Sequence, residues 1–561
     1  MARRLSPLDI AFLKMETPEA PSHIASLQIF EPPAGYKGAF VADLKASLEK
    51  IPVGSPFNLK LSPRGLPFAF PTWIPDNNFD IDFHLRHSAL PKPGRMDQLM
   101  KLVSRLHGRL LDRTRPLWEM YLIEGLEGNK FALYTKIHHA LVDGVGGMKM
   151  IDQSFSRSPD DLDIKAPWAV EQIEKRIRAN RTLSENAART AKSLMGPLRS
   201  LPQALKAIAL PGKTEAAIAF QTTKTVFNGH ITASRRFAIH TLPLAETKEI
   251  GKILGHTVND LFLAISSAAL RRYLDEKGQT PELPLTATVP VSIQLKGSSK
   301  QGNQISYVAV NLRTDLADPL ERLKAIGRSA AAAKNDMSSL SRDAVQTLAV
   351  VAQSTAALIN QFRLSDYLKP PANLVISNVP GPRETLYFKG AKLVGYYPLS
   401  ILMDGQALNI TLCSHGNQLD FGILGCRNAM PDIDTLAQFI GDAFDELKRL
   451  AHSKNSAAAP EVVVSPVATK KTASAATAKT TKAKAPAKAV VKSPAKEKVS
   501  VQAEAIQPTP SVVTEKAVVA PAVKKPKVAA KKAVKSAAAV KPPEPATAPE
   551  AEVESAAIVA A

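Results

Sequence analysis

The sequence predicts a mixed α/β (α+β) fold made of two similar-sized halves, followed by a disordered tail. Strand-like and helix-like patterns mix without a fixed period up to about residue 450. A strongly basic stretch at 175–213 separates the two halves, and every Gly, Trp, Tyr and Phe lies before residue 445. We therefore divide the chain into an N-terminal half at 1–170, a basic helical linker at 171–233, a C-terminal half at 234–451 and a tail at 452–561.

The N-terminal half contains one expected strand, one helical pattern and one hairpin. Residues 24–30 (IASLQIF) alternate like a strand, and apolar residues between Gly94 and Arg113 recur at helical spacing. Residues 118–126 and 130–138 read as two strands, joined by the turn Glu127-Gly128-Asn129. The second of these strands leads directly into His139.

The C-terminal half mixes helices and strands in the same way. The sequence predicts helices at 258–274, 316–335 and 343–362, strands at 285–291 and 373–379, and a hairpin of 408–414 with 419–425. Cys413 and Cys426 are the only cysteines, and both lie in apolar strand-like runs. Two buried thiols fit a reducing compartment and give no sign of a disulfide framework or a metal cluster.

Charge and hydropathy restrict the location of the protein. No run of 18 apolar residues occurs, and the N-terminus lacks the apolar core of a signal peptide, so we expect a cytoplasmic protein that does not span a membrane. The tail carries 18 Lys and 8 Glu, a net charge of +10, which leaves +11 of the chain's +21 for residues 1–451. The body and the tail are therefore basic independently of each other.

The segment His138-His139-Ala140-Leu141-Val142-Asp143-Gly144 contains the residues best suited to chemistry. By strand alternation, His139 continues an apolar face that is formed by Phe131, Leu133, Thr135 and Ile137. A neutral imidazole at a strand end can accept a proton near pH 7, because its ordinary pKa is about 6.5. His138 points the opposite way, and Asp143 lies where the chain can turn back.

Three interpretations of this segment compete. A metal site requires further ligands, and adjacent histidines that face opposite ways chelate poorly. A purely structural pair would have His138 and Asp143 satisfy buried backbone groups. The third interpretation makes His139 a general base that a carboxylate supports, and the wider pattern of the chain favours it.

That wider pattern resembles a known family. His138-His139-xxx-Asp143-Gly144 is similar to the HHxxxDG motif of the superfamily that includes chloramphenicol acetyltransferase and condensation domains. Over residues 3–450 the chain further resembles the bacterial wax ester synthase/acyl-CoA:diacylglycerol acyltransferase family. Four more motifs carry this resemblance: Ser6-Pro7-Leu8-Asp9, Pro116-Leu117-Trp118-Glu119, Thr257-Val258-Asn259-Asp260 and Ser377-Asn378-Val379-Pro380-Gly381-Pro382.

The resemblance implies two chloramphenicol-acetyltransferase-like halves with an active-site tunnel between them. In this family the second histidine is the base, so His139 would deprotonate a lipid hydroxyl that attacks the thioester of acyl-CoA. His138 would support His139, and Asp143 would hold the loop geometry. Asn259 would be an oxyanion donor or a structural brace, and the brace is favoured because such a pair also caps helices. The remaining expected site residues, which line the substrate channel or shape it, are Trp118, Gly144 and Asn378.

No cofactor or metal is implied, since acyl-CoA is itself a substrate. The acceptor would be diacylglycerol or a long-chain alcohol drawn from a membrane or lipid inclusion. Residues 175–213, with nine basic residues and one acid, would then be either a helical linker or a helix on anionic lipid. The tail would be a spacer, or would bind nucleic acid or anionic lipid through its charge.

Two alternatives to this function remain at the level of sequence. The first is an acyltransferase for another acceptor, as in condensation domains. The second is a granule- or nucleoid-binding protein that acts through its basic tail.

Overall fold

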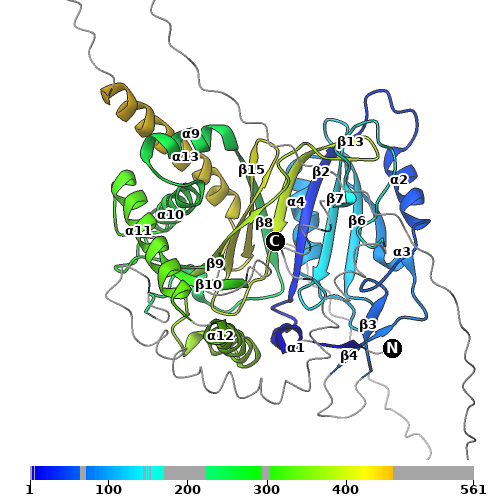
Figure 1. Ribbon diagram of the computed structural model, residues 1–561, viewed down its shortest axis with the longest axis horizontal. Coiled ribbons are helices and arrows are strands. Elements are labelled where there is room, and N and C mark those ends of the chain that lie inside the picture. The colour runs from blue at the N-terminus through cyan, green and yellow to red at the C-terminus, as the bar shows by residue number, and fades with distance from the viewer. Residues whose placement is uncertain are drawn as a thin grey trace, which may run out of the picture. The chain divides into compact units, whose positions relative to one another are not determined.

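The computed structural model describes residues 3–5, 7–63, 71–142, 147, 150, 153–169, 217, 221–293, 304–340 and 342–458 (Figure 1). Two six-stranded mixed sheets dominate this part of the chain. The mixed α/β fold predicted from the sequence is thereby confirmed.

The first sheet belongs mainly to the N-terminal half. Its strand order is β12 (Tyr387–Phe388), β13 (Ala391–Leu399), β2 (His23–Glu31), β7 (Lys130–His138), β6 (Trp118–Leu126) and β5 (Leu85–Ala89). The helices of this half are α1 (Pro7–Met15), α2 (Phe40–Glu49), α3 (Ile81–His84) and α4 (Met96–His107). A small sheet adds β1 (Arg3–Arg4), β4 (Thr72–Pro75) and β3 (Leu59–Leu61).

The second sheet has the order β10 (Gln304–Asn311), β9 (Thr286–Ile293), β11 (Leu374–Pro380), β14 (Leu408–His415), β15 (Gln418–Cys426) and β8 (Arg235–Pro243). Its helices are α9 (Leu244–Leu254), α10 (Val258–Glu276), α11 (Pro319–Ser338), α12 (Arg342–Phe362) and α13 (Ile433–Ala458). The short turns η3 (Val226–Asn228) and η4 (Leu364–Asp366) complete the described elements. Figure 1 shows α9, α10, α11 and α13 gathered on the outer side of this sheet.

One segment of the C-terminal half completes the N-terminal sheet. β12 and β13 lie between β11 and β14 in the sequence, yet β13 pairs with β2. A shared apolar core adds to this connection, since Val103 of α4 and Tyr134 of β7 pack in one cluster with Phe237 of β8 and Leu424 of β15. The two sheets are therefore held together by both backbone pairing and side-chain packing.

Helix α4 ends earlier than its apolar pattern predicts. The sequence pattern continues to Arg113, whereas α4 ends at His107 and Leu110 is 40% exposed. The reason is the close approach at Gly108, where a Cβ would lie only 2.4 Å from the carbonyl oxygen of Ala233. The chain leaves the helix at the residue that permits this contact.

The predicted linker and tail fall mainly outside the described residues. Of the linker, residues 217 and 221–233 are described, and the basic stretch at 175–213 is not. Helix α13 runs to Ala458, so residues 452–458 are helical instead of belonging to the predicted disordered tail. The packed face of α13 runs to Ala451, which is fully buried, and the following seven residues (HSKNSAA) extend this helix beyond its apolar pattern.

None of the described helices is by itself long and apolar enough to cross a bilayer. Only α9 and α10 together reach that length and hydropathy, and they are bent by 97° relative to each other.

Candidate functional site

The turn after β7 places His138 and His139 in different surroundings. β7 is paired on both sides, with His23 of β2 opposite His138 and Trp118 of β6 opposite Ile137. The backbone N–H of His139 donates to the carbonyl oxygen of Ser22 at 2.9 Å. The strand therefore ends at a fixed point, and the backbone at His139 is anchored there.

The ring of His139 is partly buried and lies against α1. It stacks on the ring of Phe12, with centroids 4.0 Å apart and planes inclined by 15°. Phe12 is itself buried in a cluster with Leu13, Leu117 and Ala140. The predicted loop residues Asp143 and Gly144 lie outside the described residues.

His138 is completely buried, and its tautomer follows from its contacts. Its Nδ1 accepts a hydrogen bond from the N–H of Ala140 at 3.0 Å, so in the neutral ring the proton is on Nε2. That Nε2 lies 3.1 Å from Oε2 of Glu16. The two atoms are close but are not aligned as in a hydrogen bond, so Glu16 and His138 are in polar contact.

Glu16 connects His138 to two other segments, those of Ser22 and Arg113. Its side chain is 2% exposed, and its Oε1 accepts from Nε of Arg113 at 3.1 Å and from Nη2 at 2.9 Å. Its Oε2 also accepts from the N–H of Ser22 at 3.2 Å. Burial alone would raise the pKa of this carboxyl, but contacts with His138 and Arg113 outweigh burial and lower it. Glu16 is thus a carboxylate at neutral pH.

Glu16 therefore fixes the surroundings of His139 on several sides. Its N–H donates to the carbonyl of Phe12, and Arg113 additionally donates to the carbonyl of Leu13 at 2.8 Å. The carbonyl oxygen of Ser22 in turn accepts a hydrogen bond from the backbone N–H of His139. We call the set Glu16, Ser22, Arg113 and His138 the Glu16 network.

The sequence interpretation missed Glu16 and Arg113. Both lie next to motifs that it had singled out, since Glu16 follows Asp9 by seven residues and Arg113 precedes Pro116 by three. The available signal was the position of each charge beside a motif, but both stand among other charged residues, Lys14 and Glu19 around Glu16 and Asp112 and Arg115 around Arg113. Nothing in the spacing indicated that the two side chains meet.

Trp118 lies in the core of the N-terminal half. It is 1% exposed, and its Nε1 donates to the carbonyl of Phe57 at 2.8 Å. Its ring stacks on His84 and Trp168, with centroids 4.6 and 5.2 Å away. Of the two roles considered for Trp118, core residue or channel wall, these contacts fit the core.

In the C-terminal half, the two predicted asparagines meet. Thr257 and Asp260 form a reciprocal capping box at the start of α10, which fixes the turn that carries Asn259. Nδ2 of Asn378 on β11 donates to Oδ1 of Asn259 at 3.4 Å. The contact joins the N-terminus of α10 to the end of β11, as a structural brace would.

The Pro-Gly-Pro turn after β11 is tightly packed. A Cβ at Gly381 would lie 2.2 Å from the carbonyl oxygen of Ser414 and 2.9 Å from Sγ of Cys413. Only glycine fits this approach to β14, so this motif is explained by packing.

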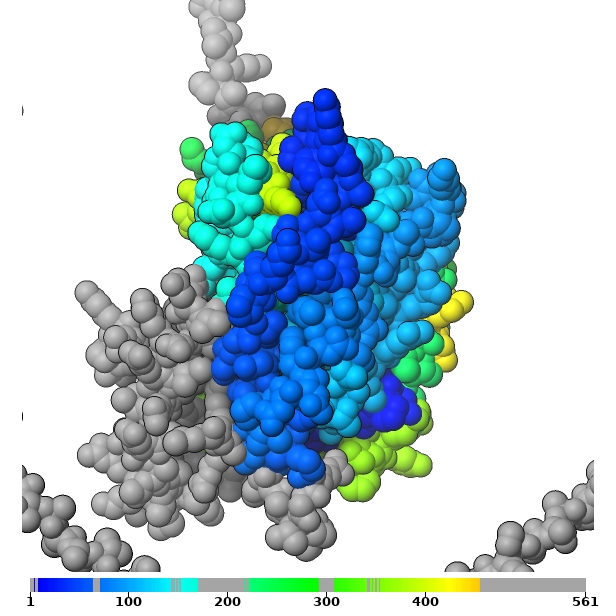
Figure 2. Space-filling view, turned by 90° about the vertical axis from the view of Figure 1, so that its right-hand side faces the viewer, coloured from blue at the N-terminus to red at the C-terminus, as the bar shows by residue number. Residues whose placement is uncertain are grey.

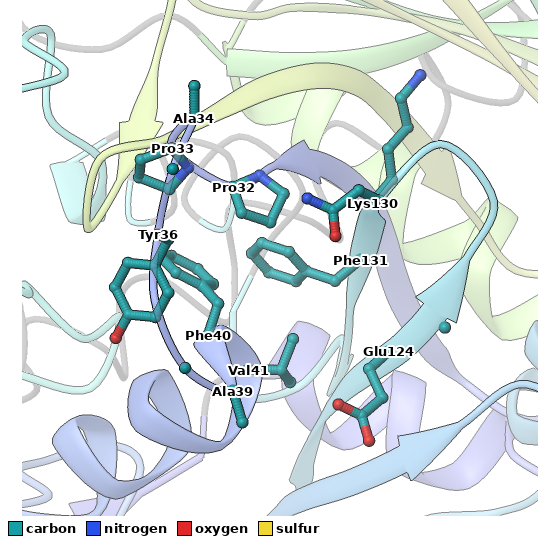
Figure 3. A pocket seen from close by; sticks show the side chains of 14 residues that line it. Pro32, Pro33, Ala34, Tyr36, Ala39, Phe40, Val41, Glu124, Lys130 and Phe131 are labelled. Atoms are coloured by element: carbon teal, nitrogen blue, oxygen red, sulfur yellow. The ribbon is translucent and has the colours of Figure 1, made fainter.

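A pocket of about 290 Å³ lies away from His139 (Figure 3). Phe40 and Phe131 face each other in its wall, with ring centroids 5.4 Å apart, and Glu124 and Lys130 are among its polar lining residues. β7 runs from this pocket to the histidines, a separation of about 25 Å at 3.3 Å per residue. The pocket is therefore separate from the His138–His139 turn. Within the described ranges, no three His, Cys, Asp or Glu side chains gather as a metal site would require.

Buried histidines beside this turn predict acid sensitivity. His107 donates from Nε2 to the carbonyl of Ser400 at 3.1 Å and contacts the Tyr134 hydroxyl through Nδ1 at 2.9 Å. Burial lowers the pKa of His107 to about 3, and burial also holds the pKa of His23 well below its ordinary value of 6.5. Between about pH 3 and 6.5 the unfolded chain binds more protons than the folded one, so acidification favours unfolding.

We expect the free energy of unfolding to fall by up to about 1.4 kcal/mol per pH unit for each of these histidines below pH 6.5. Urea denaturation at pH 7.0 and 5.5 measures the slope. His107→Gln should be less stable at both values but should show a smaller slope. Equal slopes in the variant and the parent protein would contradict this assignment.

Comparisons with known proteins identify the family to which both halves of the chain are similar. Residues 5–262 match the model of the wax ester synthase/diacylglycerol acyltransferase catalytic domain, and residues 301–448 match that of the C-terminal domain of the same proteins. The O-acyltransferase WSD of Acinetobacter baylyi is 39% identical over 444 residues, which cover 77% of this chain and 94% of that protein. A Mycobacterium tuberculosis protein named as a diacylglycerol O-acyltransferase is 38% identical over 79% of this chain and 99% of its own length.

The solved structures include a relative of similar sequence. The wax ester synthase/diacylglycerol acyltransferase from Marinobacter aquaeolei VT8 is 36% identical, with a TM-score of 0.62, and the match covers 80% of this chain and 99% of that chain.

Proposed function

Because the chain belongs to the wax ester synthase/diacylglycerol acyltransferase family, we propose that His139 is the general base with which it acylates a lipid hydroxyl. The chain is an O-acyltransferase that transfers acyl groups to lipid acceptors. We take acyl-CoA as the donor and diacylglycerol or a long-chain alcohol as the acceptor. The observation that carries the role of His139 is its anchored position at the end of β7, against Phe12 and beside the Glu16 network.

The reaction requires one proton to move twice. The neutral imidazole of His139 takes the proton of the acceptor hydroxyl while the oxygen attacks the carbonyl carbon of the thioester. A tetrahedral oxyanion forms, and its collapse breaks the carbon–sulfur bond. The imidazolium then returns the proton to the departing thiolate, which yields the ester and free CoA.

Direct transfer fits the state of the thiols. Cys413 and Cys426 are both fully buried, so neither sulfur is open to a thioester. Burial raises the pKa of Cys413 well above its ordinary value. Burial also acts to raise the pKa of Cys426, but hydrogen bonds from Thr232 and from the backbone outweigh it and lower that pKa. A buried thiol is inert as a nucleophile. We therefore propose a mechanism without an acyl-enzyme intermediate.

The supporting roles are assigned as follows. His138 is the supporting residue that the Glu16 network holds in place beside His139. Asp143 and Gly144 keep their proposed role in shaping the following loop. We assign Asn259 to the brace with Asn378, because its amide oxygen already accepts from that residue. The tunnel between the halves stays a prediction.

The cellular context is proposed from the acceptor and the charge. A lipid acceptor requires access to a membrane or lipid inclusion, so we propose a cytoplasmic protein that associates with such a surface from one side. The basic tail at 452–561 would contribute attraction to anionic lipid or nucleic acid. The matches over both halves do not favour the condensation-like or nucleoid-binding alternatives.

An acceptor panel tests this function. Purified protein and palmitoyl-CoA are mixed with a diacylglycerol, hexadecanol or hexadecylamine, and CoA release and products are measured. We expect ester formation with one or both hydroxyl acceptors and rates at least tenfold lower with the amine. Amide formation as the main reaction would support the condensation-like alternative and contradict this proposal.

A further inference from the structure

Exposed apolar side chains are concentrated at the end of α12. Among the described residues, eight large hydrophobic side chains are exposed, and four of them lie between residues 358 and 368. These four, which we call the α12 patch, are Leu358, Phe362, Tyr367 and Leu368, with exposed fractions of 54%, 64%, 84% and 44%. Such clustering in a short segment marks a contact surface, since scattered single residues are the ordinary case.

Near its C-terminal end, α12 has one buried face and one exposed face. Asn360 faces inward, since its Nδ2 donates to the carbonyl of Met15 at 3.4 Å and its Oδ1 accepts from the N–H of Asp404 at 2.6 Å. Ala356 and Ala357 pack against the cluster that contains Phe12. Leu358 and Phe362, four residues apart, share a face that remains exposed. The patch is thus additional to the surface that α12 buries against α1.

A fixed turn presents the rest of the patch. Nζ of Lys224 donates to the carbonyls of Ser365 and Asp366 at 2.6 and 2.7 Å. His230 contacts the same turn, 2.8 Å from Asp366 Oδ2 and 2.9 Å from Ser365 Oγ. These contacts fix the backbone of η4, and the side chain of Tyr367, which follows it directly, is exposed.

Charge at the edges of the patch favours an anionic lipid surface. Arg363 and Lys369 are exposed within and directly after the patch, and Lys224 is exposed beside it. One carboxylate, that of Asp366, lies nearby and is held 2.8 Å from Nε2 of His230, so three cations face one anion. Apolar and aromatic side chains bordered by Lys and Arg are the composition of segments that insert into the headgroup region of a bilayer.

We propose that the α12 patch inserts into the surface of an anionic lipid layer and so holds the protein where its acceptor is dissolved. This inference rests on the proposed function, because a lipid acceptor gives the contact its purpose. A second copy of the chain is a poorer occupant, since a stable dimer needs about 800 Å² per partner from 20 to 30 residues and the patch offers four.

The patch lies one helix away from the proposed base. The inner side of α12 contacts α1 through Asn360 and Met15, and Phe12 of α1 stacks on His139. Figure 1 shows α12 and α1 at the same end of the molecule, and in Figure 2 yellow-green atoms border the dark blue N-terminal ones at that edge. Insertion here would place the lipid surface beside the segment that carries the chemistry.

Vesicle flotation of the full chain tests the proposal. The vesicles contain phosphatidylcholine and phosphatidylglycerol at a ratio of 7:3, without acyl-CoA, in 0.5 M NaCl. At this salt concentration charges are screened beyond about 4 to 5 Å. The attraction of the basic tail, and that of Arg363, Lys369 and Lys224, is therefore weakened, and the apolar contacts of the patch dominate the binding. We expect the double variant Phe362→Ser, Tyr367→Ser to lower the vesicle-bound to free ratio about tenfold, because two large apolar contacts are lost.

A matched control distinguishes an effect of the α12 patch from the effect of removing any exposed apolar side chains. Leu162→Ser with Leu283→Ser removes two apolar side chains of 61% and 51% exposure outside the patch, and should leave the ratio unchanged. Tyr367→Trp should in addition show a blue shift of tryptophan emission when vesicles are added. Unchanged partition of the patch variant, or an equal loss in the control, would overturn the proposal.

Two further outcomes are informative. If the parent protein is a dimer that the patch variant converts to monomer with unchanged vesicle binding, the patch is a self-association surface and the proposal is wrong. Flotation is measured without turnover, so it is independent of the acyl-transfer assay. Patch-dependent binding in a protein that fails to release CoA would contradict the proposed function alone.

Discussion

His139→Ala should lower kcat/KM for acyl transfer by about two to four orders of magnitude, the usual contribution of a general base. The variant keeps the strand end, because the backbone N–H of residue 139 still reaches the carbonyl of Ser22. It loses the stacking on Phe12, which costs about 1 kcal/mol of stability. The expected result is therefore a folded protein with little activity.

The measurement is the initial rate of CoA release over a range of acyl-CoA concentrations. His87→Ala is the matched control, since this histidine lies in the same half on β5 and pairs with Glu124 at 3.4 Å. It should retain most of the parent activity. Circular dichroism on both variants confirms that a loss of rate is not a loss of fold.

Glu16→Gln should produce the second largest effect, on both stability and rate. The amide cannot accept the hydrogen bonds of Arg113 and Ser22 as the carboxylate does, and it presents donors to groups that also donate. Breaking a buried ion pair by removing one partner costs about 3 kcal/mol, and Arg113 is partly exposed, which limits the loss. We expect kcat to fall at least tenfold, with the KM for acyl-CoA changed less.

A comparable pair elsewhere provides the control. Asp420 is fully buried in the C-terminal half, and its Oδ2 lies 2.6 Å from Nδ1 of His415. Asp420→Asn should destabilise the protein to a similar degree, yet reduce kcat less than Glu16→Gln does when both are assayed well below their melting temperatures. An equal effect of the two variants on kcat would reduce Glu16 to a purely structural role.

The sequence predicted local elements well where two signals coincided. The strands at 118–126 and 130–138 match β6 and β7 residue for residue, because alternation and the turn Glu127-Gly128-Asn129 both define them. The helical pattern alone misjudged α4, whose end depends on the contact of Gly108 with Ala233. The spacing of apolar residues predicts which face of a helix is buried. It does not predict where the helix ends when a segment distant in sequence fixes that end.

Long-range features could not be predicted in this way. β13 joins the N-terminal sheet although its sequence lies in the C-terminal half, and no local pattern specifies that partner. Glu16 and Arg113 are 97 residues apart and meet only through the fold. The motifs identified His138 and His139, but the partner that holds His138 became visible only in the structure.

Chemical rescue of His139→Ala tests the central claim most directly. If residue 139 supplies the base, added imidazole should restore CoA release at least tenfold, in proportion to the concentration of its unprotonated form. His87→Ala should not respond to imidazole. A His139→Ala variant that retains more than about a tenth of the parent rate without imidazole would contradict the assignment of His139 as the general base.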